Sequence, residues 1–434
     1  MNALFLTDLD SRAAIKGSRE PLGLQSIWTR LGRQVVSNLT TVTRSVRDFT
    51  AHLLGFHLLE RLRDEGGAVG SELEVFLRWE QLAAYSRAIG NDDLGFRGTE
   101  RVRARVQGGE RLVLSAETAH QILSNQKIYG LWGLFTNASR DSGLVEVDPL
   151  RLAPAGMRLL EEAILPALAR GGLRDAGPLV ELVGRDRVNL DHDGKHRTLI
   201  KAVATALSPK LTKAETALYR ETLAWGGPKN PLGGLQRSFV DVLDEVDLDR
   251  TVRLNPRLVD ACARAARRQK HSMLAERLEQ IRVAEGVFAP CVHLFTFLLA
   301  RQNQSVADVV AAVRKAWGKR VPGIDVDGFR ALRSDVVQAT SVEMANRLEV
   351  IGVALDGGDY EGLVRRLIEQ NAAVMRDRGG ASPWISLEND RLRIRFRDEL
   401  DELPSKETLP QLWSSPYFID SLRAIAAELR ERHR

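Results

Sequence analysis

The sequence has few residues of the kinds on which disulfides, structural metal sites and base-stacking surfaces depend. Its two cysteines, Cys262 and Cys291, do not form a CxxC pair, and two thiols cannot supply a four-cysteine zinc site. So few cysteines favour a reducing compartment. Aromatic residues make up only 6% of the chain, which argues against an exposed face of rings that stacks single-stranded bases.

Segments that would carry the chain into or across a membrane are also missing from the sequence. We find no apolar run that approaches the roughly 20 residues of a membrane-spanning helix. The N-terminus, MNALFLTDLDSR, contains acidic residues where a signal peptide has a basic start. We therefore expect a cytoplasmic protein with no membrane partner.

Motifs of several enzyme classes are absent too. Gly194-Lys195 and Gly318-Lys319 lack the upstream glycine and the following hydroxyl of a phosphate-binding loop, and neither HExxH nor a nucleophile elbow occurs. The segment from Asp191 to His196 is either a metal or nuclease site or a surface turn, and Gly194 favours the turn because it disfavours a helix. We predict no catalytic residues, no metal and no cofactor.

Length and composition are those of an ordinary globular protein. A chain of 434 residues with 44% hydrophobic residues is long enough for two or three domains. The net charge is +5, from 62 basic and 57 acidic residues. This excess is too small to identify a partner, so the clustering of charge carries more information than its total.

One stretch, residues 115–162, combines helical and strand patterns in a distinctive order. Its helices follow from apolar residues at helical spacing, and its strands follow from alternation on both sides of Asp148-Pro149. The expected elements are, in order, a helix capped by Ser115, a turn at Ser124-Asn125, a helix over 126–140, strands over 144–147 and 150–152, and a helix from Pro154.

This order resembles a winged-helix module, the helix-turn-helix variant in which a β-hairpin follows the recognition helix. The resemblance implies that the second helix lies beside a DNA groove and that the wing contacts phosphates. The residues to which it points are Gln126, Lys127, Asn137, Ser139, Arg140 and, on the wing, Arg151. The alternative is a small α/β subdomain that contacts other proteins, as winged helices often do.

Two further segments carry arginines at every second position. The first predicts a strand with a basic face, and the second predicts the outward face of a C-terminal β-hairpin. Such faces suit phosphates, because binding comes mainly from the displacement of condensed counterions. The alternative is an edge strand that is charged to prevent aggregation. The arginines are Arg101, Arg103 and Arg105 in the first segment and Arg391, Arg393 and Arg395 in the second.

The patterns together predict a mainly α protein. We expect a multi-helix N-terminal region with a winged-helix module, then a C-terminal helical array and a small C-terminal β-hairpin. Glycine-rich connectors divide the chain into consecutive segments. These are an N-terminal helical region over 1–64, a winged-helix domain over 65–170, a helical domain over 171–375, and the hairpin with a final helix over 376–434.

Three phrases, NLTTVTRSVRDFT, GLWGLFTNASRDSGLV and LWSSPYFIDSL, resemble uncharacterised bacterial proteins that accompany helicases and nucleases in anti-phage defence clusters. The resemblance implies a non-enzymatic subunit of a multi-protein system. The arginines add double-stranded DNA as an expected partner beside other protein subunits. We expect little sequence preference, since the second helix has few side chains able to make bidentate base contacts. The alternatives are a protein-interaction scaffold and a winged-helix transcriptional regulator, and a buried nuclease site is the least favoured.

Overall fold

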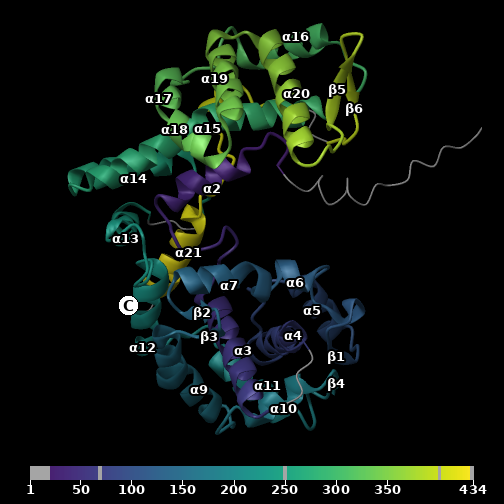
Figure 1. The fold of residues 1–434 in the computed structure, drawn as a ribbon, viewed down its shortest axis with the longest axis vertical. Coiled ribbons are helices and arrows are strands. Elements are labelled where there is room, and N and C mark those ends of the chain that lie inside the picture. The colour runs from purple at the N-terminus through teal and green to yellow at the C-terminus, as the bar shows by residue number, and fades with distance from the viewer. Residues whose placement is uncertain (1–19, 67–70, 248–251, 399–401, 431–434) are drawn as a thin grey trace, which may run out of the picture. The chain divides into compact units, whose positions relative to one another are not determined.

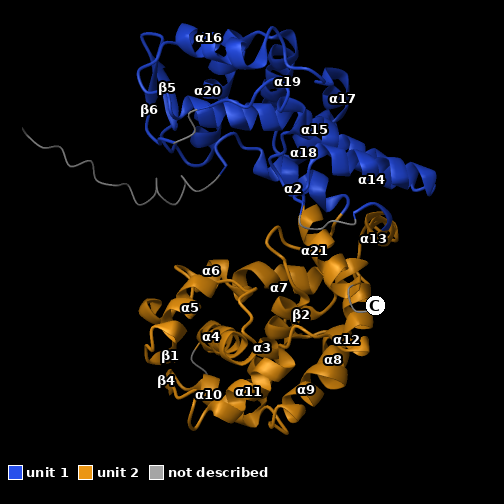
Figure 2. Ribbon diagram, turned by 180° about the vertical axis from the view of Figure 1, so that it is seen from behind, with its two compact units in different colours: residues 1–35, 245–247, 252–417 blue, residues 36–244, 248–251, 418–434 orange. Residues whose placement is uncertain are grey.

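The computed structural model describes residues 20–66, 71–247, 252–398 and 402–430. Most of these residues are helical, and the strands within these ranges form three two-stranded antiparallel ribbons. The predicted mainly α class is confirmed. The chain divides into two compact units that are interleaved in sequence (Figures 1 and 2), unlike the four consecutive segments expected from the patterns. Unit 1 contains residues 1–35, 245–247 and 252–417, and unit 2 contains residues 36–244, 248–251 and 418–434.

Unit 2 is built around two long helices, α3 (Val46–Asp64) and α4 (Glu72–Asn91), which are buried along most of their length. Both are apolar around much of their circumference, as central helices must be. The other elements of unit 2 are α5 (Thr99–Gln107), β1 (Leu112–Ser115), a 3-10 turn (Thr118–His120), α6 (Gln126–Tyr129), α7 (Leu131–Asp141), β2 (Val145–Val147), β3 (Leu150–Leu152), α8 (Pro154–Leu159), a π-helical turn (Leu160–Ile164), α9 (Leu165–Arg170), α10 (Gly177–Gly184), β4 (Arg187–Leu190), α11 (Arg197–Ala206), α12 (Lys213–Tyr219), a second π-helical turn (Arg220–Ala224), most of α13 (Leu235–Val246), and α21 (Ile419–Arg430).

Side chains of α3 and α7 interlock in the core of unit 2. Phe49 of α3 meets Phe135 of α7 edge to face, with ring centroids 5.1 Å apart. His52 of α3 forms hydrogen bonds with the hydroxyls of Thr136 and Ser139 on α7, at 3.2 and 3.1 Å. Burial lowers the pKa of His52 to about 3, because a charged imidazole is costly in an apolar core. The neutral ring therefore fixes α7 against α3.

Unit 1 is organised on one long helix, α15 (Ser272–Leu298). By length and composition this helix could cross a membrane, but 72% of its most apolar window is buried inside the protein. A buried apolar helix of this kind is typical of a folded core. The other elements of unit 1 are α2 (Gln25–Arg33), α14 (Pro256–Arg268), α16 (Val306–Trp317), α17 (Val326–Ala331), α18 (Arg333–Ala339), α19 (Val342–Gly357), α20 (Tyr360–Asp377), β5 (Ile385–Glu388), β6 (Arg391–Ile394) and a 3-10 turn (Leu409–Gln411).

The predicted C-terminal hairpin is confirmed. Strands β5 and β6 pair antiparallel, with Glu388 opposite Arg391. Asn389 and Asp390 form the two-residue turn with φ of 49° and 62°, which is the left-handed geometry that Asn and Asp tolerate best after glycine. Leu392 of β6 is buried while its arginine neighbours are exposed, as the alternation predicts.

The predicted strand at Arg101, Arg103 and Arg105 is wrong, because these residues lie in helix α5. Of the apolar residues that alternate with them, only Val102 is fully buried. A single buried position does not distinguish a period of two from a helical period. Arg, Glu and Ala are good helix formers, and Gly98, with φ of 85°, begins the helix in a conformation that favours glycine.

The predicted helix that starts at Ser115 is also wrong. Ser115 ends strand β1, which pairs antiparallel with β4 so that Ser115 lies opposite Arg187. The side chain of Gln81 on α4 completes this arrangement by accepting a hydrogen bond from the Ser115 amide at 2.9 Å and donating one to its carbonyl at 2.8 Å. These partners are distant in sequence, so a local capping pattern could not reveal them.

Candidate nucleic-acid interface

Two helices and a hairpin follow the β1 strand in unit 2 (Figure 1). Only Gly130 separates α6 from α7, whereas one continuous helix is predicted there. Strands β2 and β3 then pair around Asp148-Pro149, with Glu146 opposite Arg151. A hairpin thus follows the second helix, as its sequence pattern predicts, but β1 pairs with β4 and not with this hairpin.

A buried carboxylate, Glu80 of α4, fixes the junction between α6 and α7. Its Oε1 accepts a hydrogen bond from the amide of Leu131 at 2.8 Å, and its Oε2 accepts one from the side chain of Gln126 at 2.9 Å. A side chain at Gly130 would meet Glu80 Oε2 at 2.5 Å and the Gln126 carbonyl at 2.4 Å. The sharp bend between the two helices therefore requires glycine.

Glu80 lies in surroundings that disfavour its charge. Burial raises the pKa of Glu80 to about 7, and the hydrogen bonds from Leu131 and Gln126 lower it only in part. The carboxyl group therefore keeps its proton to a higher pH than an ordinary glutamate does. Because Glu80 holds the first residue of α7, its protonation state affects the stability of the helix pair.

Helix α5 is tied to the turn that precedes α6. The guanidinium of Arg105 donates hydrogen bonds to the carbonyls of Ala119, His120 and Gln121, at 3.0, 2.7 and 3.2 Å. It also donates one to the hydroxyl of Tyr85 on α4 at 3.0 Å. Arg105 therefore has a structural role that leaves it little capacity for a phosphate.

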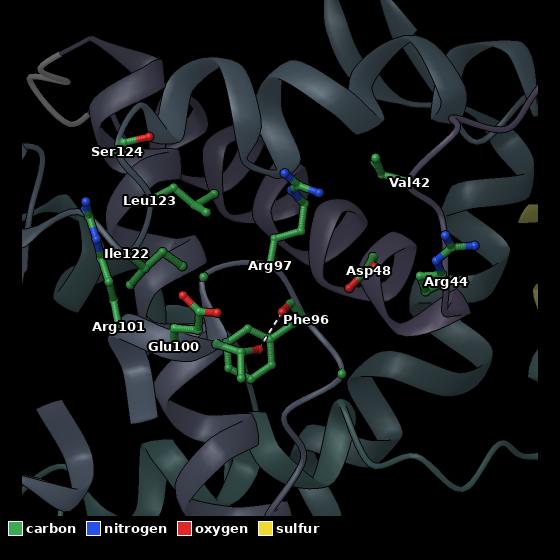
Figure 3. A pocket seen from close by; sticks show the side chains of 13 residues that line it. Val42, Arg44, Asp48, Phe96, Arg97, Glu100, Arg101, Ile122, Leu123 and Ser124 are labelled. Atoms are coloured by element: carbon green, nitrogen blue, oxygen red, sulfur yellow. Dashed lines mark hydrogen bonds between the residues drawn. The ribbon is translucent and has the colours of Figure 1, made fainter. Parts of the chain in front are cut away.

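A surface pocket of about 680 Å³ opens between this turn, the start of α5 and the start of α3. In Figure 3, Arg101 and Ser124 lie at one end of the pocket, Arg44 and Val42 lie at the other end, and Arg97 lies between them. The arginines come from three different segments of the chain, which the fold brings together.

None of the three arginines of this pocket forms an ion pair with a carboxylate among the described residues. Arg97 donates from Nε to the carbonyl of Tyr129 at 2.7 Å, and Arg101 donates from Nη1 to the carbonyl of Gln121 at 3.3 Å. Both acceptors are neutral. Among the described residues, none forms an ion pair or a side-chain hydrogen bond with Arg44.

Acidic groups near the pocket offset part of this charge. Asp48, in the wall, accepts a hydrogen bond from Arg87 at 3.0 Å, and Arg87 also contacts Asp93 at 2.7 Å. Together Asp48, Asp93 and Arg87 carry at most one net negative charge, because one guanidinium balances one of the two carboxylates. Burial raises the pKa of Asp48, which disfavours even this charge. Glu100 on the rim contributes one more. The three arginines of the pocket exceed these two negative charges, and the pocket is net positive.

Four of the predicted DNA-contacting side chains in unit 2 are exposed and form no ion pair with another described residue. Arg103 on α5, Lys127 on α6 and Asn137 on α7 are all exposed, and no described residue forms a hydrogen bond or an ion pair with their side chains. Arg101 is exposed as well and lines the pocket.

Other predicted contacts are occupied by the protein itself. Gln126 is 0% exposed and therefore cannot contact a DNA groove. Its side-chain amide donates a hydrogen bond to Glu80 in the core instead. Arg140 pairs with Asp141 at 2.9 Å and Arg151 pairs with Glu146 at 2.6 Å. Exposed ion pairs of this kind contribute little, so a phosphate can compete for either arginine. Ser139 is buried against α3 and cannot face a groove.

The predicted arginines of the C-terminal hairpin belong to unit 1. Arg391 donates to the carbonyl of Asn303 at 2.8 Å. Arg393 pairs with Glu388 at 2.5 Å and contacts the side chain of Asn303. Arg395 follows the strand directly, and no described residue partners its guanidinium. Two of these three arginines therefore support the hairpin rather than remaining free.

Local sequence patterns do not join Arg44, Arg97 and Arg101 into one site. Arg97 is an isolated arginine in the loop between α4 and α5, where no periodicity marks it. Arg44 directly precedes Ser45, whose hydroxyl caps α3 by accepting a hydrogen bond from the Arg47 amide at 3.1 Å. A capping serine is the one local signal that places Arg44 outside the helix.

Metal-binding geometry is not found in the part of the chain that the structure describes, where no group of three or more His, Cys, Asp or Glu side chains could hold an ion. The segment from Asp191 to His196 is a turn in which Asp191 accepts hydrogen bonds from the amides of Gly194 and Lys195, at 2.9 and 3.2 Å.

Comparison of the chain with protein-family models, with curated proteins and with solved structures found no match.

Proposed function

We propose that the protein binds double-stranded DNA through phosphate contacts made by the α5–α7 face of unit 2. The observation that carries this proposal is the arrangement of free positive charge there. Arg103 and Lys127 are exposed and unpaired among the described residues. They lie on α5 and α6, and the start of α5 and the turn before α6 line the net-positive pocket that contains Arg97 and Arg101. Cations whose charge is not already balanced are those that release counterions when they meet a phosphate backbone.

The composition of α7 supports binding with little sequence preference. Asn137 is its one exposed, unpartnered amide side chain among the described residues, and Arg140 is shared with Asp141. Specific readout of a base pair needs bidentate donors and acceptors such as free Arg, Asn or Gln. Gln126, the strongest reader among the predicted residues, is buried. Phosphate contacts therefore dominate the expected affinity.

We further infer that the protein is a non-enzymatic, cytoplasmic subunit of a multi-protein bacterial system of the anti-phage type. The resemblance of its sequence phrases to proteins of such clusters supports this role. In unit 1, Arg395 directly follows β6 and its guanidinium has no partner among the described residues, so it offers a further contact either for DNA or for an acidic partner protein.

Protein binding is the second candidate function for the same face. Ile128 is 53% exposed and Tyr129 is 44% exposed at the end of α6. Neighbouring exposed apolar side chains are more typical of a protein interface than of a phosphate surface. A partner with acidic groups and an apolar centre would fit Arg97, whose Nε contacts the Tyr129 carbonyl.

Fluorescence anisotropy with a labelled duplex, measured over a series of salt concentrations, tests the DNA-binding proposal. The variant R103A/K127A should bind the duplex about tenfold more weakly than wild type. The slope of log K against log salt concentration should also be smaller in magnitude by up to about 2, since each lost phosphate contact lowers that slope by about 0.9.

The matched control is R174A/K201A, which removes one arginine and one lysine that are also exposed on unit 2. Lys201 lies on α11, and Figures 1 and 2 show α11 at the opposite edge of unit 2 from α6. This control should bind like wild type. Equal losses in the two double variants, or no binding of wild type at low salt, would refute the proposal.

A further inference from the structure

We propose that the pocket between α3, α5 and the turn before α6 binds the phosphate of a nucleotide, either the terminal nucleotide of a DNA strand or a free nucleotide. For the strand end the inference rests on the proposed DNA binding, whereas for the free nucleotide it does not. The two sources share one chemistry, a phosphate group attached to a nucleoside, and the experiment below separates them.

Three guanidinium groups face the pocket from separate segments. Arg44 comes from the turn before α3, Arg97 from the loop after α4, and Arg101 from the first turns of α5. Guanidinium groups bind phosphate oxygens through paired N–H donors, which gives both strength and direction. Because the neutral carbonyl acceptors of Arg97 and Arg101 leave several of their donors unused, these side chains retain both charge and hydrogen-bonding capacity.

The start of α5 adds backbone donors to the same pocket. Gly98, Thr99 and Glu100 all line it, and within the described residues no side chain caps this nine-residue helix. The first N–H groups of a helix have no partner inside the helix and carry partial positive charge, which favours an anion. The hydroxyl of Thr99 contacts the carbonyls of Leu94 and Phe96 at 2.7 and 2.6 Å, which fixes the loop that carries Arg97.

The size and walls of the pocket fit more than a bare phosphate. Its volume of about 680 Å³ lies within the range of small-molecule sites. Val42, Phe96, Ile122 and Leu123 supply an apolar wall beside the arginines. Positively charged side chains beside an apolar wall suit a nucleoside phosphate, in which a sugar joins an anionic group to a flat base with apolar faces.

A deeper, narrower cavity continues from the pocket toward the core. Phe96, Arg97, Ile122 and Asp48 line both spaces, and the inner one reaches Glu80. Its free volume is only about 20 Å³, which is too small for a base. The ligand is therefore confined to the outer pocket, above the buried carboxylates.

The test compares duplex DNA that carries a phosphate at its ends with the same duplex that carries hydroxyl groups, and adds calorimetric titrations with a deoxynucleoside monophosphate and with inorganic phosphate. The variants are R44A and R101A. Arg44 has no partner among the described residues, so R44A should fold normally. The control is R103A, which removes an exposed arginine of the same helix that does not line the pocket.

If a strand end is the ligand, wild type should bind the phosphorylated duplex at least about tenfold more tightly than the hydroxyl duplex, because several charge-assisted hydrogen bonds are added. R44A and R101A should lose this preference, and R103A should weaken both duplexes equally. If a free nucleotide is the ligand, the monophosphate should bind wild type in the calorimeter more tightly than inorganic phosphate, and R44A should abolish that binding.

The two proposals fail in different ways. DNA binding without any preference for phosphorylated ends, combined with no heat from the monophosphate, would overturn the pocket inference and leave the proposed function intact. Binding of the monophosphate in a protein that does not bind duplex DNA would overturn the proposed function and leave the inference intact. A preference that survives in both R44A and R101A would place the phosphate elsewhere and overturn the inference.

Discussion

Replacing Glu80 by glutamine should change how the stability of the protein depends on pH. The pKa of Glu80 is raised from its ordinary 4.5 to about 7 by burial. A carboxyl group whose pKa is higher in the folded state favours folding while it is protonated, and this contribution is lost as the pH rises through the folded pKa. The free energy of unfolding should therefore fall as the pH rises from about 4.5 to about 7.

The size of the effect follows from the same two values. The difference between 4.5 and about 7 corresponds to about 3 kcal/mol of unfolding free energy, and most of it falls between pH 5 and pH 8. Burial of His52, whose pKa is lowered from 6.5 to about 3, acts in the opposite direction below pH 6.5. Wild type and E80Q share this histidine, so their difference isolates Glu80.

Urea unfolding followed by circular dichroism, at pH 5 and at pH 8, measures this difference. The new side-chain amide in E80Q still accepts a hydrogen bond from Leu131, but its NH₂ group opposes the Gln126 amide, which should cost about 1 kcal/mol at pH 5. At pH 8 the order should reverse, with E80Q more stable than wild type. Parallel pH profiles for the two proteins would refute the claim that Glu80 is buried with a raised pKa.

Three further substitutions test the packing around the candidate interface, with unfolding free energy as the measurement in each case. R105A should lose about 1–2 kcal/mol, because several hydrogen bonds to carbonyl groups are removed, whereas the exposed R103A should change stability by less than about 0.5 kcal/mol. G156A should lose more than about 2 kcal/mol, since its new Cβ would lie 2.1 Å from the carbonyl oxygen of Leu144. F135A, which empties a fully buried site, should lose about 3–5 kcal/mol. Wild-type stability in R105A or G156A would show that the local geometry is not as described.

Elements defined by local patterns were predictable from the sequence. In helix α16 the buried residues Val306, Val309, Val313 and Trp317 recur at helical spacing, and Ser305 and Asp308 form a capping box at its start. The hairpin β5–β6 follows from alternation on both sides of a two-residue Asn-Asp turn. In both cases the determining residues are neighbours in sequence, so the information is complete within a short window.

Elements that depend on distant partners were not predictable. Strand β1 exists because it pairs with β4, and Leu112 lies opposite Leu190. Gln126 looks like an exposed polar residue at the start of a helix, but Glu80, which lies 46 residues away in sequence, binds it in the core. The interleaving of the two units has the same origin, since α21 at the end of the chain joins unit 2.

The candidate site shows the same division. The alternation of arginines pointed to Arg101, although it predicted a strand where the structure has a helix. No local pattern joins Arg101 with Arg44 and Arg97 in one site. Each of these arginines is unremarkable in its own segment, and only the packing of α3, α4 and α5 brings them to one pocket. Arg103 on α5 and Lys127 on α6 were predictable as exposed residues from local patterns, because the exposure of each depends on one helix only.

Lysine acylation footprinting with and without duplex DNA tests the central claim most directly. Lys127 is exposed on α6, and Lys195 and Lys201 are exposed elsewhere on unit 2 as internal controls. Saturating DNA should slow acylation of Lys127 several-fold and leave Lys195 and Lys201 unchanged, because only Lys127 belongs to the proposed face. Acylation of Lys127 at the same rate in free and DNA-bound protein would contradict the account.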